Sequence, residues 1–248
     1  MRKVSLVVAL VTSMLCLTAV AVAATNTYTV KGSIASGGSK AKPKPVAVNF
    51  DYSIGTDDGT LSNPVKTYKI HFAGLKFSPK SVAAGKYCTA ASINAASSDS
   101  KCSAKTKVGS GEVNANVGSA GKPIDPNLVC NLALDIYAGG PKSLALYLHG
   151  DQSTTPRCIA PISQAIDAKL TTDSKGSALT FTVPPVLLHP VAGLDSGITR
   201  VTSKIKKIGS GKKALFYSEG CKGTRKIGVT FTAENGAKET VEASGGKC

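Results

Sequence analysis

Short stretches in which apolar and polar side chains alternate recur along most of this chain. From residue 46 to residue 54, every second residue is a valine, phenylalanine, tyrosine or isoleucine. A period of two puts successive side chains on opposite faces of a β-strand, so the stretch predicts a half-buried strand. Comparable stretches occur at 65–75, 131–138, 143–150, 164–172, 177–183, 197–208, 212–220, 227–231 and 238–243. The pattern predicts an all-β fold.

Turn-forming residues join these stretches in pairs. Gly139-Gly140 separates two leucine-rich stretches, and Asn235-Gly236 separates the last two stretches of the chain. Asn-Gly is the strongest short hairpin signal because both residues tolerate positive φ. We also expect 46–54 to pair with 65–75, because turn residues lie between them.

One segment breaks the alternation. Between Cys88 and Cys102 the chain is rich in alanine, which has the best helix propensity, and this predicts a short helix. About ten strands and one short helix predict a disulfide-stabilised β-sandwich, Ig-like in a broad sense. The length allows one such domain or two packed β-subdomains.

The first residues have the composition of a secretory signal peptide. Arg2 and Lys3 precede a long apolar run, which ends in the small residues Ala21-Val22-Ala23. We expect cleavage near Ala23; the alternative is an uncleaved anchor, because the run is long enough to span a membrane. The expected organisation is a signal peptide at 1–23, a flexible linker rich in Lys, Gly, Pro and Ser at 24–44, and a β-domain at 45–248.

The cysteines after this cleavage site are expected to form disulfides, because the chain is exported and their number is even. Six cysteines allow 15 pairings. Pairing in sequence order is favoured, since the first two bracket the helix and the last hairpin brings Cys248 near Cys221. Zinc is the alternative, but the chain has no C-x-x-C pair. The cysteines concerned are Cys88, Cys102, Cys130, Cys158, Cys221 and Cys248.

The chain is strongly basic, with 30 Lys and Arg against 15 Asp and Glu. Most of these cations are lysines, whereas base readout favours arginine, so we expect no sequence-specific nucleic-acid binding. The densest basic run, 200–213, contains no acidic residue and suggests a patch for anionic envelope polymers or a membrane surface. The alternative is a solvated strand face. The expected patch consists of Arg200, Lys204, Lys206, Lys207, Lys212 and Lys213.

Signatures of catalysis are absent from the sequence. The three histidines, His71, His149 and His189, lie on or just after expected strands, and no nucleophile elbow occurs. His149 and Asp151 have a spacing that would suit a metal ion, although a solvent-exposed strand end is the favoured interpretation. We expect no catalytic residues, no metal site and no cofactor.

The aromatic residues divide into two groups. Most fall on the apolar side of expected strands and predict core packing. Tyr137 and Tyr147 are out of phase with their leucine neighbours on the hairpin at Gly139-Gly140, so we expect them to form an outward-facing aromatic pair.

Several short motifs resemble those of exported actinobacterial proteins that have no assigned activity. Cys88 and Cys102 bracket the alanine-rich segment, Val108–Gly111 reads V-G-S-G, and the final hairpin lies between Cys221 and Cys248. Ser103 stands where these proteins usually have proline. The resemblance implies secretion and a β-rich fold, and it brings no catalytic residues.

The sequence therefore predicts a secreted, non-catalytic protein with a structural or binding role at the cell envelope, held there by anionic polymers. One alternative is an exported hydrolase of unrecognised type. Another is a protein that binds a small hydrophobic ligand between its sheets. Oligomeric state and ligand are left open.

Overall fold

The computed structural model describes residues 25–35, 37–78, 86–221 and 223–247. The expected signal peptide, its cleavage site and Cys248 lie outside these residues. Over the described part of the chain, no helix is long and apolar enough to cross a membrane. The fold is all-β, as the alternating pattern predicted.

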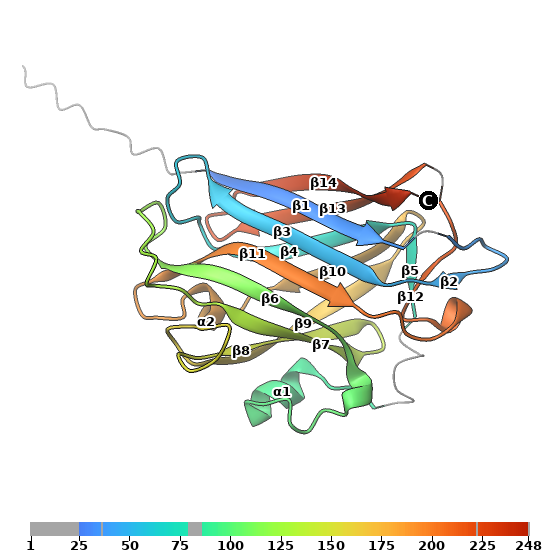
Figure 1. Ribbon diagram of the computed structural model, residues 1–248, viewed down its shortest axis with the longest axis horizontal. Coiled ribbons are helices and arrows are strands. Elements are labelled where there is room, and N and C mark those ends of the chain that lie inside the picture. Colours follow the sequence, from blue (N-terminus) through green and yellow to red (C-terminus); the bar gives the residue numbers. More distant parts are fainter. Residues whose placement is uncertain (1–24, 36, 79–85, 222, 248) are drawn as a thin grey trace, which may run out of the picture.

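Eleven antiparallel strands form one large sheet that curls almost into a closed barrel (Figure 1). Its two end strands, β1 and β14, lie in contact. Gly32 on β1 leaves room inside this seam for the side chain of Ile227 on β13, because a Cβ at residue 32 would lie 2.6 Å from Ile227 Cδ1. In spatial order the strands are β1 (Asn26–Ile34), β3 (Val48–Thr56), β11 (Asp195–Ile205), β6 (Lys107–Gly118), β7 (Leu132–Gly140), β8 (Ser143–Gly150), β9 (Ile162–Thr172), β10 (Gly176–Thr182), β4 (Val65–Ala73), β13 (Thr224–Ala233) and β14 (Lys238–Lys247).

A second, three-stranded sheet and the short helices lie around this barrel-like sheet. The small sheet orders its strands β2 (Lys44–Pro45), β12 (Phe216–Ser218) and β5 (Leu75–Phe77). The 3₁₀ helix η3 (Gly211–Lys213) contacts β2 and β12. Figure 1 shows this group at one end of the barrel and α2 (Pro185–Leu188) at the other. Helix α1 (Ala90–Ala96) contacts β8 and β9, and the 3₁₀ helix η2 (Ala104–Thr106) precedes β6.

The expected sandwich is therefore replaced by a single barrel-like sheet. Alternation identifies the face of each strand that meets the core, and it does so equally for a sheet that curls on itself and for two stacked sheets. The architecture depends on which strands become neighbours, and four of the ten neighbouring pairs in the large sheet join strands that are distant in sequence.

Two expectations about the first half of the chain were wrong. The segment 46–54 does not pair with 65–75: β3 lies between β1 and β11, and β4 lies between β10 and β13. The expected linker 24–44 contains β1, which pairs with β3 along its whole length. The Lys, Gly and Pro content that suggested a linker begins only after this strand.

Local hairpins and disulfides match the predictions. β7 pairs with β8 around Gly139-Gly140, and β13 pairs with β14 around Asn235-Gly236. Cys88 bonds to Cys102, and Cys130 bonds to Cys158. Cys221 is also disulfide-bonded, while the expected bond to Cys248 falls on a residue outside the described ones. Disulfides of this kind indicate an oxidising compartment.

The interior of the barrel is packed with apolar side chains, and aromatic rings cluster inside it. Tyr68 stacks on Phe181, with ring centroids 5.0 Å apart. Such pairs contribute about 0.5–1.5 kcal/mol beyond the burial of their area. The residues expected in the core are buried, with Phe181 partly so: Phe50, Tyr52, Tyr68, Phe72, Phe181 and Phe231.

Candidate functional site

Only part of the expected polyanion patch is free to bind an anion. Arg200 lies on β11 and pairs with Asp51 of β3, with 2.6 Å between Nη2 and Oδ2, so its charge is compensated. The other five members are exposed. Among the described carboxylates, only that of Glu219 comes within 4.0 Å of one of them, at 3.9 Å from Lys212. These five residues are Lys204, Lys206, Lys207, Lys212 and Lys213.

Lysines from the N-terminal segment lie at the same end of the barrel. β2 pairs with β12 and contacts η3, which brings Lys44 beside residues 211–213, and the turn at 39–42, which carries Lys40 and Lys42, lies just before β2. Figure 1 shows β2, β12 and η3 together, opposite α2. We call this surface the basic end and define it by Lys40, Lys42, Lys44, Lys206, Lys207, Lys212 and Lys213, all exposed.

The expected surface pair of tyrosines is covered. Tyr137 and Tyr147 do point out of the barrel, but α1 packs over them with the Cys88–Cys102 disulfide, and both are buried. The Tyr137 hydroxyl donates to the carboxylate of Asp99, and the Tyr147 hydroxyl lies 3.0 Å from Ser163 Oγ. The pair therefore anchors α1 and offers no exposed aromatic platform.

Two of the three histidines, His149 and His189, contact acidic groups at the surface, whereas no described carboxylate lies within 4.0 Å of His71 on β4. His189 lies between Asp195 and Glu234, 3.1 Å from each. His149 stacks on Tyr147 and lies 3.7 Å from Asp135. Ser163 is the cross-strand neighbour of His149, but its hydroxyl donates to the carbonyl oxygen of Ser97, at 2.7 Å, and not to the histidine. Within the described part of the chain, no group of three or more His, Cys, Asp or Glu is placed to hold a metal ion.

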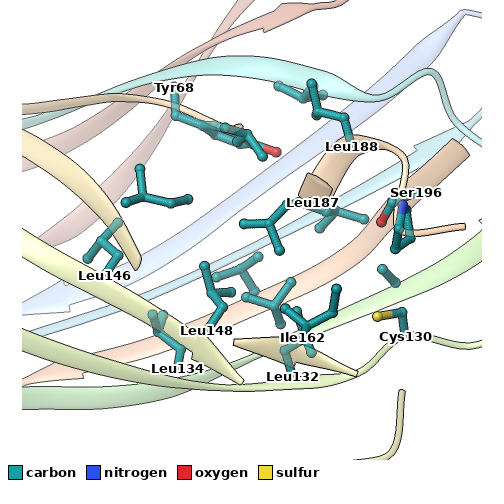
Figure 2. Close-up of a pocket in the computed structure, with 18 of the residues that line it drawn as sticks. Tyr68, Cys130, Leu132, Leu134, Leu146, Leu148, Ile162, Leu187, Leu188 and Ser196 are labelled. Carbon is teal, nitrogen blue, oxygen red and sulfur yellow. The ribbon is translucent and has the colours of Figure 1, made fainter. Parts of the chain in front are cut away.

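The feature of the structure best suited to bind something is a cavity inside the barrel. It has a volume of about 80 Å³ and lies near the end closed by α2. Figure 2 shows Tyr68 on one side of it and leucines of β7 and β8 on the other, with two leucines of α2 beside them. Of the lining residues labelled in Figure 2, only Tyr68 and Ser196 have a hydroxyl group. The apolar ones include Leu132, Leu134, Leu146, Leu148, Ile162, Leu187 and Leu188.

The hydroxyl of Tyr68 is the unusual group in this lining. Tyr68 is 0 % exposed, and its Oη has no hydrogen-bond partner. Burial raises its pKa well above the usual range, and the neighbouring phenol of Tyr52 raises it further through its charge and a side-chain hydrogen-bonding contact, although the poor geometry of that contact leaves Oη without a well-formed hydrogen bond. The group is therefore a neutral donor and acceptor. Buried tyrosine hydroxyls usually find a partner.

A second cavity continues the first along the interior of the barrel. It has a volume of about 50 Å³ and shares five lining residues with the larger cavity. The shared residues form the partition between the two spaces. They are Tyr52, Leu134, Leu146, Phe181 and Val201.

One other buried polar group is incompletely paired. Arg225 is 1 % exposed, and its Nη2 donates to Ser218 Oγ at 2.5 Å, while Nε and Nη1 have no partner. Burial lowers its pKa. Arg225 lines neither of the two interior cavities, so it does not belong to this site.

The sequence placed Tyr68 in the core and gave it no function. One signal was present: the alternating pattern puts Tyr52 and Tyr68 on inward faces, and each brings a hydroxyl into an apolar interior. The cavity itself has no signature in a single sequence, because it is a property of how distant strands meet.

Comparison with known protein families, with curated proteins and with solved structures found no match. The resemblance to exported actinobacterial proteins stays an expectation from short motifs, and the candidate site depends on the geometry alone.

Proposed function

We propose that this protein is an exported, non-catalytic binding protein that holds a small apolar ligand inside its barrel-like sheet. The observation that carries the proposal is the unpaired hydroxyl of Tyr68 in the wall of an apolar cavity. Leaving such a group unpaired costs about 1–3 kcal/mol. A ligand with one hydroxyl or carbonyl group would remove that cost, because it supplies the missing hydrogen bond.

The volumes support a compact ligand. An engineered apolar cavity of about 150 Å³ takes up benzene. The two adjoining cavities, of about 80 and about 50 Å³, approach this volume only when the side chains between them move aside and the two spaces merge. We therefore assign a ligand about as large as one ring, with one hydrogen-bonding group.

The hydrolase alternative has weaker support. Its best location is the shallow depression that contains His149 and Ser163. There the hydroxyl of Ser163 is engaged by Ser97 and Tyr147, and His149 is directed to Asp135. A serine nucleophile requires a histidine base at hydrogen-bond distance.

The test uses phenol and toluene, two rings of similar shape of which only phenol has a hydroxyl. Calorimetric titration should show that Tyr68→Phe weakens phenol binding by roughly 2–13-fold, the equivalent of one hydrogen bond of about 0.5–1.5 kcal/mol. Toluene binding should be unchanged or stronger. Tyr147→Phe is the control, since its hydroxyl lies outside the barrel under α1. Failure of both probes to bind would reject the proposal.

A second role is supported by the basic end: retention on anionic envelope polymers. Its lysines come from two segments that are distant in sequence, and charge attraction of this kind is long-range. Membrane insertion is less well supported, because the large apolar side chains exposed in the described chain, Ile124 and Val186, lie outside the basic end. We therefore assign a linear polyanion as the partner.

Binding to immobilised polyphosphate at increasing salt tests this role. Replacing Lys206, Lys207, Lys212 and Lys213 by glutamine should abolish retention at moderate salt. The control replaces four exposed lysines away from the basic end and has the same net charge: Lys66, Lys69, Lys122 and Lys238. Equal loss in both variants, or preferential binding to phosphatidylglycerol vesicles, would contradict the assignment.

A further inference from the structure

The wall of the barrel is incomplete between β9 and β10. These strands pair only where residues 169–172 meet residues 177–180. Beyond Lys169 and Thr180 the two strands separate, although β9 continues its pairing with β8 back to Ile162. The seven residues from 162 to 168 thus form an edge without a strand on the β10 side.

Part of this edge is satisfied by a side chain. Asn94 of α1 accepts from the backbone N–H of Ala165 at 2.7 Å and donates to its carbonyl oxygen at 2.9 Å. The amide thus makes the two hydrogen bonds that a neighbouring strand would make. Because unpaired backbone groups are costly, this contact stabilises the separation of the two strands.

A depression lies on the outer side of the split. Its volume is about 470 Å³, and its lining includes the exposed Asp167, Lys169 and Thr182. Two further lining residues, Ile166 and Phe181, also line the interior cavity. These two side chains therefore form the partition between the depression and the cavity.

Phe181 is the more exposed part of this partition. Ile166 is buried, whereas Phe181 is half-buried. The ring of Phe181 stacks on Tyr68, its cross-strand neighbour on β4, at an interplanar angle of 14°. On its other side β9 has already separated, so no neighbouring strand holds the ring there. A half-buried ring beside such a gap, with cavities adjoining it, can change rotamer without displacing a strand.

We infer that the ligand enters and leaves the cavity through the split between β9 and β10, with Phe181 as the gate. This inference rests on the proposed function. It adds that Phe181 controls the rate of exchange, whereas Tyr68 controls which ligand is held. A ligand that passes Phe181 arrives directly at the Tyr68 hydroxyl, because the two rings are stacked.

The experiment measures exchange of toluene by NMR in the full mature chain. Phe181→Ala should raise the association and dissociation rates at least roughly tenfold, a barrier about 1.4 kcal/mol lower. Phe181→Trp should slow both rates. Leu148→Ala is the matched control, because it enlarges the same cavity from the β8 wall and leaves the split unchanged.

The outcomes separate this inference from the proposed function. If toluene binds and exchanges at the wild-type rate in both Phe181 variants, the gate is rejected and the cavity remains a binding site. Equal acceleration in Leu148→Ala would also reject it, since cavity size would then explain the rates. If toluene does not bind to the wild-type protein, the proposed function fails first. Should Phe181→Ala not fold, the Phe181→Trp variant decides.

Discussion

Replacing Tyr68 by phenylalanine should stabilise the ligand-free protein, which is an unusual result for a truncation in a core. The change removes one oxygen atom and keeps the ring that contacts Phe181 and Phe231, at centroid distances of 5.0 and 5.7 Å. The hydroxyl is fully buried and has no hydrogen-bond partner. In the unfolded chain water satisfies it, so folding costs about 1–3 kcal/mol that the variant does not incur.

Thermal and urea unfolding under non-reducing conditions measure this effect. For a chain of about this length, 1 kcal/mol shifts the Tm by roughly 2–4 °C, so the expected increase is about 2–12 °C. Tyr137→Phe provides a control of opposite sign, because its hydroxyl bonds to Asp99 and its loss should destabilise the protein. Equal destabilisation by both substitutions would refute the reasoning, since it would mean that Tyr68 already has an effective partner, either Tyr52 or a buried water.

Three further predictions concern the supports of the fold. Replacing Cys88 and Cys102 by serine should lower the free energy of unfolding by about 3 kcal/mol, the entropy of a loop of this length, and calorimetry should show the change under non-reducing conditions. Asn94→Ala should cost about 1–3 kcal/mol, because it leaves the N–H of Ala165 unpaired while the carbonyl keeps only the hydrogen bond from Gln164, and hydrogen exchange should quicken at Ala165 first. Backbone N–H groups of Lys175 and Gly176 lower the pKa of Asp173 in the folded protein. The contribution of Asp173 to the free energy of unfolding is therefore present above the ordinary aspartate pKa and is lost as the pH falls through the lower pKa of the folded state. Acid titration of stability should therefore be less steep in Asp173→Asn, and an unchanged slope would contradict this.

Sequence reasoning succeeded where structure is local. The hairpins at Gly139-Gly140 and Asn235-Gly236 and the helix between Cys88 and Cys102 each depend on neighbouring residues, and all three formed as predicted. It failed for β3 and β4, whose partners β11 and β13 lie more than a hundred residues away. Alternation is identical for any choice of partner, so nothing in the pattern selects the right one.

The outward tyrosines illustrate a different limit. Their phase was predicted correctly, since Tyr137 and Tyr147 do leave the barrel. Their exposure was wrong, because burial depends on whether another element packs over that face. Here α1 does so through Ile93, which is itself 1 % exposed. A helix of seven residues gives no indication in the sequence of the strands on which it will pack.

The same distinction explains why Tyr68 carries the functional argument. A void lined only by leucine and isoleucine can result from imperfect packing, and a larger side chain could fill it without loss. A tyrosine in that wall is different, because phenylalanine would keep the ring contacts and avoid the unpaired hydroxyl. The cavity therefore contains a group that is unfavourable while the site is empty and becomes favourable when a ligand with one polar group enters. The cost of the unpaired hydroxyl and the hydrogen bond to the ligand both depend on Tyr68 Oη. The single substitution Tyr68→Phe should therefore raise the stability of the empty protein and lower its affinity for phenol.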